Sequence, residues 1–237
     1  MTLRAVFLDV GNTLLYEIPS RFEIYARAAR RRGVEVDASE MTRLMRLAHA
    51  ELPREVEGSF RYSDPWFRVY VRRIFVEHLG LAPAALPGLL EELFAAFEDP
   101  QTFGLHEGAR ELMREARARG LRLGIVSNWS ARLPRVLAGL GIDDAVDFVL
   151  CSALERIEKP EPAIFRAALE HAEVAPEEAL HAGDHLRNDV QAAQELGIEG
   201  VLVDHSGRFR DDPELGCRRV HGLPELTTYI LSRTGTG

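Results

Sequence analysis

The sequence predicts an α/β protein: a parallel β-sheet with helices on both faces, interrupted after its first strand by an all-helical insert. Three observations support this prediction. One short apolar run stands near the N-terminus, about 85 residues with helical periodicity follow it, and apolar runs then alternate with amphipathic stretches after Gly104. Near-continuous apolar strands are typical of a parallel sheet that is covered on both faces.

The first predicted strand and the insert occupy the N-terminal part of the chain. Residues 4–8 form a short apolar run that ends at Asp9, and the glycine two positions later indicates a tight loop. Amphipathic helices are then predicted at residues 21–32, 38–52, 65–79 and 86–98. Glycines and prolines separate these helices, and no strand pattern of any strength is visible between them.

The alternation after Gly104 supplies the rest of the sheet. Strands are predicted at residues 121–126, 147–151, 180–182 and 200–203. Helices are predicted at residues 107–118, 132–140, 162–172, 188–196 and 223–231. Because right-handed crossovers connect strands of this kind, the sheet should be parallel. The chain is therefore predicted to divide into a discontinuous core, residues 1–16 and 104–237, and a helical insert at residues 17–103, which we call the cap.

The composition argues against several classes of function. The chain has 237 residues, of which 46% are hydrophobic, and a net charge of −8, which opposes binding to a nucleic-acid backbone. No run approaches the roughly 20 apolar residues of a membrane span, and no signal peptide precedes the first strand. Two cysteines do not make a disulfide framework. We therefore expect a cytoplasmic protein, and the sequence does not decide between monomer and homodimer.

Polar and charged residues follow the ends of the predicted strands, where open parallel sheets bind ligands. Asp9, Asp184 and Asp189 stand there together with Ser127 and Lys159. Each residue has an ordinary structural explanation, such as a turn or a helix cap. Together they predict one site, because carboxylates that share a cleft repel one another unless a cation is present. An oxygen-rich site of this kind suits Mg²⁺.

Lys159 is the single lysine beside twenty-eight arginines. An arginine head is a wide planar fork, whereas a lysine head is a compact charge on a flexible stem. A site crowded with carboxylate and phosphate oxygens could require the smaller group. Chance survival of one lysine in an arginine-rich chain is the alternative interpretation, and the composition alone does not decide between them.

Four segments in order carry a family resemblance: FLDVGNTL, VSNWS, KPEPAIF and AGDHLRND. Over its whole length the chain resembles the haloacid dehalogenase superfamily of hydrolases, with a Rossmann-like core and a helical cap of the C1 type. The resemblance implies a phosphatase-like branch that acts on a small phosphorylated molecule. In that branch Asp9 would attack phosphorus and form an aspartyl-phosphate.

The resemblance also implies roles for the other residues of these segments. Ser127 and Lys159 would act with Asp9 in catalysis, because Lys159 would neutralise charge that Asp9 shares with the phosphate. Phosphate would be bound by Thr13, Ser127, Asn128 and Lys159. Mg²⁺ would be bound by Asp9, the Gly11 carbonyl, Asp184 and Asp189.

Gly11 departs from the pattern of the phosphatases in this superfamily, which carry a second aspartate at that position. That aspartate protonates the leaving oxygen, and a glycine cannot, although its carbonyl can still face the metal. Loss of general acid–base help typically costs on the order of 10²–10⁴ in rate. We therefore expect reduced activity, with a bias toward aryl and acyl phosphates. His185 or Glu17 could replace the missing acid, and a loop role for His185 is the simpler interpretation.

Other functions within the same superfamily stay open. A metal-independent 2-haloacid dehalogenase needs no acid, and Arg21, Asn128 and Trp129 could form its halide cradle. A vestigial or regulatory protein could have kept the fold without turnover. The branch that cleaves carbon–phosphorus bonds through a cap lysine is excluded, because residues 19–103 contain no lysine.

Overall fold

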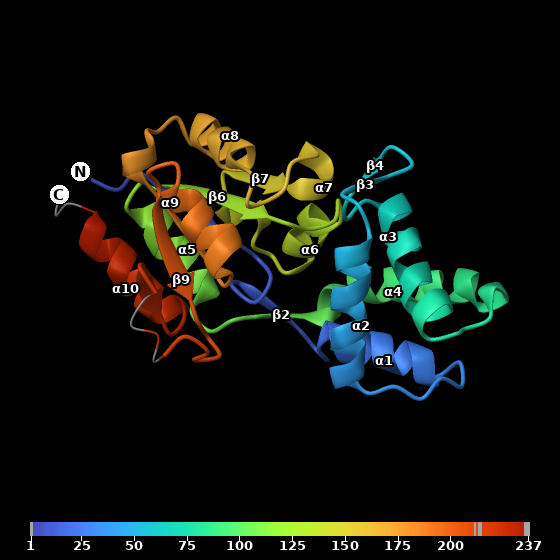
Figure 1. Cartoon of the computed structure of the whole chain (residues 1–237). Coiled ribbons are helices and arrows are strands. Elements are labelled where there is room, and N and C mark those ends of the chain that lie inside the picture. Colours follow the sequence, from blue (N-terminus) through green and yellow to red (C-terminus); the bar gives the residue numbers. More distant parts are fainter. Residues whose placement is uncertain (1, 211, 213–214, 235–237) are drawn as a thin grey trace.

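A computed structural model describes residues 2–210, 212 and 215–234. Its main sheet has six strands in the order β10-β9-β8-β1-β6-β7, and every pair of neighbours is parallel (Figure 1). The strands are β1 (Ala5–Leu8), β6 (Arg122–Ser127), β7 (Phe148–Cys151), β8 (Ala179–Gly183), β9 (Glu199–Val203) and β10 (Arg218–Val220). The predicted α/β fold with a parallel sheet is confirmed.

β1 lies in the interior of the sheet, between β6 and β8. Leu8 is paired with Ile125 of β6 and with Ala182 of β8, so the carboxyl ends of these three strands lie at one edge. This register brings together the residues that follow each strand. It is the property of the fold on which the site depends.

Helices cover both faces of the sheet (Figure 1). Val6 and Leu8 belong to one hydrophobic cluster, which includes α5 (Ala109–Ala118), α6 (Leu133–Gly139) and α10 (Leu223–Arg233). Ala5 and Phe7 belong to another, which includes α8 (Pro162–Ala172) and the short α9 (Ala192–Gln194). Because successive strand residues point to opposite faces, the apolar run of β1 packs against both helical layers.

The predicted cap residues form helices with a hydrophobic cluster of their own, to the right of the sheet in Figure 1. The α-helices are α1 (Arg21–Arg30), α2 (Ala38–Glu51), α3 (Asp64–Arg72) and α4 (Leu86–Glu98). A π-helix, η1 (Arg73–His78), continues α3, so the single helix predicted at residues 65–79 has two parts. Short 3₁₀ turns lie at Pro83–Ala85 and Pro100–Thr102.

The sequence predicted an all-helical cap, but the cap also contains two short strands. A hairpin joins β3 (Glu55–Val56) to β4 (Ser59–Phe60). Its turn is Glu57-Gly58, and both residues have positive φ, 51° and 74°, as a two-residue turn of type I′ requires. Strands of two residues are too short to give an alternating pattern, which explains why the sequence did not indicate them.

A two-stranded antiparallel ribbon connects the core to the cap. It pairs β2 (Leu15–Glu17) with β5 (Phe103–Leu105), and neither strand was predicted. Gly104 is opposite Tyr16, and a Cβ at Gly104 would lie 2.6 Å from the tyrosine ring, so a side chain there would clash. The predicted domain boundaries fall inside this ribbon. None of the described helices is both long and apolar enough to span a bilayer.

The remaining elements lie in the core. They are the short α7 (Ser152–Glu155), the 3₁₀ turns Asp143–Ala145 and Pro176–Glu178, and the π-helix η6 (Leu186–Gln191). The helix predicted at residues 188–196 is therefore a π-turn followed by the short α9. The edge strand β10 was not predicted from its three residues.

Candidate active site

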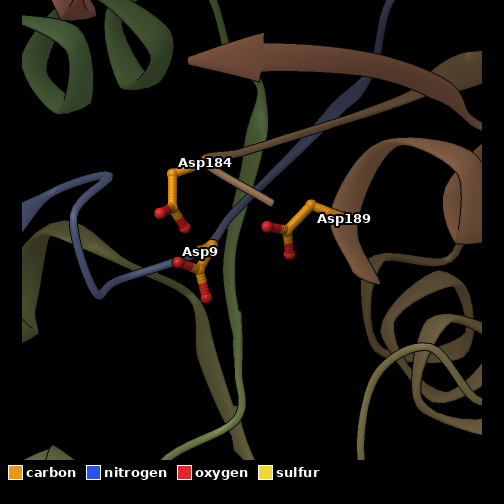
Figure 2. Close-up of side chains that lie close together, drawn as sticks. All are labelled: Asp9, Asp184 and Asp189. Atoms are coloured by element: carbon orange, nitrogen blue, oxygen red, sulfur yellow. The ribbon is translucent and has the colours of Figure 1, made fainter. Parts of the chain in front are cut away.

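Three carboxylates meet at the carboxyl edge of the sheet. Asp9 follows β1, Asp184 follows β8, and Asp189 lies in η6. Oxygen atoms of all three lie within 4.8 Å of one another, and Figure 2 shows the three side chains close together. A Cβ on Gly183 would lie 2.3 Å from the Asp189 carboxyl carbon, so the glycine permits this close approach. The structure thus brings together the three aspartates predicted from the sequence.

Lys159 lies among these carboxylates and is 3% exposed. Its Nζ donates to Asp9 Oδ1 at 2.7 Å and also to Asp189 Oδ1. Burial alone would lower the pKa of Lys159, but the negative charges of Asp189 and Asp9 overcome it and raise the pKa above its usual value. The lysine is therefore a permanent cation that balances these two aspartates.

Asn128 positions the lysine through its backbone. The Lys159 N–H donates to Asn128 Oδ1 at 2.8 Å, and Asn128 Nδ2 donates to the Lys159 carbonyl at 2.8 Å. Both ends of the amide are thus engaged. Asn128 follows β6 directly, so this pair of hydrogen bonds ties the lysine-bearing loop to the strand end.

Two hydroxyl groups fix the carboxylate of Asp9. Ser127 Oγ donates to Asp9 Oδ1 at 3.0 Å, and Thr13 Oγ1 donates to Asp9 Oδ2 at 3.2 Å. Both hydrogen bonds are buried, and Asp9 itself is 7% exposed. Ser127 and Thr13 therefore lie beside Asp9, where the resemblance had placed them, and hold its carboxylate in one orientation.

The acidic residues differ in how their charge is balanced. Burial, followed by the charges of Asp9 and Asp189, raises the pKa of Asp184 to about 7. Burial opposes ionisation of Asp189, but Lys159 and His181 lower its pKa below the usual range. Asn12 Nδ2 donates to Asp184 Oδ2 at 3.3 Å, and among the described residues no cation forms an ion pair with Asp184. A third carboxylate without a cationic partner fits a divalent metal ion.

His181 is a buried member of the site that the sequence analysis missed. It lies on β8, is 0% exposed, and places Nε2 3.2 Å from Asp189 Oδ1. Burial lowers its pKa despite the neighbouring aspartate, so a neutral ring with its proton on Nε2 would donate to Asp189. A histidine within the apolar run of residues 179–183 was the available signal.

The residues proposed to replace the missing acid have other partners. His185 is exposed, and its Nδ1 accepts a hydrogen bond from the Asn188 N–H, so its ring caps the turn. Its backbone N–H donates to Asp189 Oδ2 at 2.9 Å. Glu17 forms an ion pair with Arg21. These contacts favour structural roles for His185 and Glu17.

Gly11 faces the cap side of the site. A Cβ on Gly11 would lie 3.2 Å from Trp129 Cζ3 and 3.6 Å from Arg21 Nη2. The space in which a second aspartate would begin is thus bordered by an indole ring and a guanidinium group. Arg21, Asn128 and Trp129 are the three residues considered above for a halide cradle, and all of them line one cavity.

Fold and site together define an α/β protein with a parallel sheet, carboxylates at the strand ends and a helical insert. A family model described as haloacid dehalogenase-like hydrolase matches residues 3–197. The chain belongs to this family, and the resemblance predicted from its motifs is confirmed.

Individual proteins agree with this assignment. The haloacid dehalogenase-like hydrolase domain-containing protein 3 of Bos taurus is 34% identical, over 97% of this chain and 93% of that protein. A phosphoserine phosphatase of Thermus thermophilus is 32% identical, over 94% and 98%. A solved HAD phosphatase of Thermococcus onnurineus shares the fold with a TM-score of 0.68 at 23% identity, over 99% and 100%. Solved dehalogenases share the fold as well, so the fold alone does not select the reaction.

Proposed function

We propose that the chain is a Mg²⁺-dependent phosphomonoesterase that acts on a small phosphorylated molecule through an aspartyl-phosphate on Asp9. The observation that carries this proposal is that a lysine balances the charge of two of three neighbouring carboxylates but not of the third. Lys159 contacts Asp9 and Asp189, whereas Asp184 has an amide partner and a raised pKa. A carboxylate that has no cationic partner and lies beside two others suits a divalent ion, which would balance its charge. The similarity to a phosphoserine phosphatase supports the same reaction class.

The metal site would consist of Asp9, Asp184, Asp189 and the carbonyl of Gly11. Mg²⁺ usually binds one or two carboxylates together with substrate phosphate. When bound, it would neutralise charge on the phosphate oxygens and on the carboxylates. The acidic cluster in Figure 2 supports this assignment, because its oxygens are close enough to share one ion.

The residues around Asp9 would orient it for attack on phosphorus. Ser127 and Thr13 hold its two oxygens, and Lys159 balances its charge, so little reorganisation is needed on reaction. The attack would break the bond to the leaving oxygen and form the aspartyl-phosphate, which water then hydrolyses. Ser127, Thr13, Asn128 and Lys159 would bind the transferred group, with Asn128 acting through the lysine backbone.

The proposal assigns separate roles to the core and the cap. Residues 1–16 and 104–237 would form the catalytic core, and residues 17–103 would act as a cap that closes over the substrate. The two cysteines are free, which supports a reducing compartment, and we place the protein in the cytoplasm.

Hydrolysis of 4-nitrophenyl phosphate with Mg²⁺, and with EDTA in its place, tests the function. We expect Mg²⁺-dependent release of 4-nitrophenol, and loss of a factor on the order of 10⁴ or more in Asp9→Asn, as for other covalent enzymes without their nucleophile. Asp143→Asn is the matched control, because Asp143 is exposed on a 3₁₀ turn. Activity that survives both EDTA and Asp9→Asn would contradict the proposal.

Dehalogenation is the second candidate, because Arg21, Asn128 and Trp129 line one cavity. Against it, Asn128 uses both ends of its amide on Lys159, and Arg21 is paired with Glu17. Chloride release from 2-chloropropionate in the presence of EDTA would favour this candidate. Phosphate release that requires Mg²⁺ would exclude it as the main activity.

A further inference from the structure

A cavity of about 250 Å³ lies between the cap and the core. Nine of its sixteen lining residues are aromatic, including Tyr62, Trp66, Phe67, Phe94 and Trp129. These nine are half of the eighteen Phe, Tyr and Trp residues of the chain. Six of the nine rings also belong to the hydrophobic cluster of the cap or pack against it, so they contribute both to the cap core and to the cavity wall. The cavity wall therefore has a composition suited to a flat apolar ligand.

The charged groups of the wall already have partners. Glu17 pairs with Arg21, and Arg132 pairs with Asp64 and Glu98 and lies 4.4 Å from the centre of the Phe94 ring. A polar substrate such as a sugar would have to break these pairs or leave its own hydroxyl groups without partners. The paired charges thus favour an apolar occupant.

The wall also contains a neutral polar pair, in addition to Asn128 and Ser130. His49 Nε2 lies 3.2 Å from the Tyr62 hydroxyl, and burial, followed by the charge of Arg61, lowers the pKa of His49. The imidazole is therefore neutral at pH 7. The pair therefore adds no charge to the wall.

The cavity adjoins the site on the side of Gly11. Asn128, Trp129 and Ser130 line it, and they follow Ser127, which donates to Asp9. The Cα–Cβ direction of Gly11 points at Trp129 Cζ3 and Arg21 Nη2, which belong to the same wall. Asp9 is not part of the wall, so the cavity would receive the leaving group rather than the phosphate.

We infer that this cavity binds the ring of an aryl phosphate, and that aryl phosphates are the substrate class of the site. This inference rests on the phosphatase function proposed above. The Asp9 carboxylate attacks phosphorus, and the bond between phosphorus and the aryl oxygen breaks with its electron pair leaving on the aryloxide. The aryloxide takes its proton from solvent. Water then hydrolyses the aspartyl-phosphate, which releases inorganic phosphate and restores Asp9.

The absence of a side chain at Gly11 agrees with this substrate class. An aryl oxygen has a pKa near that of tyrosine, about 10, whereas an alkyl oxygen resembles water, at about 15.7. An aryloxide can therefore leave without a general acid, and an alkoxide cannot. The volume agrees as well, because an apolar cavity of about 150 Å³ is enough to bind benzene. A cavity of about 250 Å³ can hold one ring or a fused pair.

Three substrates and two variants test the inference. Phenyl phosphate has an aryl group, acetyl phosphate has a better leaving group, a carboxylate, without a ring, and 2-phosphoglycerol has a poor alkyl leaving group. We expect 2-phosphoglycerol to have the lowest kcat/KM of the three. Tyr62→Asn removes one ring of the wall, and asparagine accepts the backbone φ of 66° at this position. Glu57→Asn is the matched control, because Glu57 also has a positive φ, 51°, lies in the hairpin that precedes Tyr62 and is exposed.

Tyr62→Asn should lower kcat/KM for phenyl phosphate by about 10-fold, the size expected for one lost ring contact. The same variant should leave acetyl phosphate unchanged, and Glu57→Asn should change neither substrate. An equal loss on both substrates, or no loss on phenyl phosphate, would overturn the inference. Hydrolysis of acetyl phosphate by the unaltered protein shows in each case that the proposed function itself stands.

Binding of phenol gives a readout that does not require turnover. Trp66 and Trp129 are the two tryptophans of the chain, and both line the cavity, so their fluorescence should report an occupant. We expect phenol to change this emission with saturation, and Tyr62→Asn to weaken its binding by a similar factor. Unsaturable quenching, or equal binding by both proteins, would refute the cavity as a ring site. Saturable binding without hydrolysis of any substrate would instead refute the proposed function alone.

Discussion

The acidic site and the aromatic cavity adjoin each other but are built from opposite kinds of residue. At the sheet edge, Asp9, Lys159 and Asp189 are each at most 7% exposed and held by hydrogen bonds or ion pairs. In the cavity, aromatic rings form most of the wall, and its charged groups are paired, Glu17 with Arg21 and Arg132 with residues outside the wall. The first region is arranged for one reaction, and the second for the shape of a ligand.

The difference follows from the elements that carry each region. The residues of the acidic site are attached to the ends of buried parallel strands and to the loops that follow them, which the rest of the sheet holds in place. Most of the cavity wall comes from cap helices that have their own hydrophobic cluster. Substitutions in the sheet edge should therefore affect every substrate, and substitutions in the cavity only some of them.

Lys159→Arg gives the largest expected effect on this comparison. The wide guanidinium head cannot replace an ammonium that is 3% exposed and contacts two carboxylates. We expect kcat to fall by roughly 10²–10³ on phenyl and acetyl phosphate alike, as when one charge-stabilising donor is lost. Phenol binding, measured by tryptophan fluorescence, should be unchanged.

The control for this variant is Arg156→Lys, an exposed cation in the same loop that pairs with Glu55. It should retain full activity. A fully active Lys159→Arg protein would show that the single lysine survives by chance. Loss of activity on only one of the two substrates would show that the acidic site and the cavity do not have separate roles.

Asp184 links metal binding to pH. Its pKa is raised from 3.8 to about 7, so between these pH values the folded protein holds a proton that the unfolded chain has lost. Stability from this group therefore falls as pH rises from about 4 to 7 and stays low above 7, where a cation can restore it. We expect Mg²⁺ at about 100 times its Kd to add ~2.7 kcal/mol at pH 8, or roughly 5–10 °C in Tm.

At pH 5 the same Mg²⁺ concentration should raise Tm less, because the ion must displace the proton. Asp184→Asn should remove both the effect of Mg²⁺ on Tm and the pH dependence of that effect. Thermal unfolding monitored by circular dichroism gives Tm for both proteins, with and without Mg²⁺, at pH 5 and pH 8. An equal Tm shift at both pH values would show that Asp184 is not the residue that responds to the metal.

Gly11→Asp gives the smallest expected effect and tests the border between the two regions. The new side chain must displace Trp129 by a few tenths of an ångström, and its carboxylate would face Arg21, which favours the ionised form over the acid. We therefore expect a gain of only about 10-fold on 2-phosphoglycerol, below the usual range for a general acid, and no gain on phenyl phosphate.

Gly11→Asn has nearly the same size without an acidic proton and is the matched control for this variant. Rates of phosphate release compare the two proteins. The same gain in Gly11→Asn would attribute the effect to a shift of Trp129 and not to proton donation.

The position of some site residues, including Lys159, could be predicted from the local sequence. Apolar runs indicated the strands, and the rule that parallel strands end at one edge placed the residues after them together. The structure brings Asp9, Ser127, Lys159 and Asp184 to that edge. By contrast, the hairpin at residues 55–60 and the ribbon around Tyr16 are strands of two or three residues, too short to produce a period.

The order of charged and apolar residues by itself determined the sheet, the helical insert and the identity of the acidic site. These depend on patterns within single strands and helices and on general rules for connecting them. Only the tertiary structure decided that His181 supports Asp189, that Trp129 and Arg21 border Gly11, and that rings from distant segments enclose a cavity. The reason is physical: such contacts join residues far apart in the chain, and they depend on how the packed cap is positioned against the sheet.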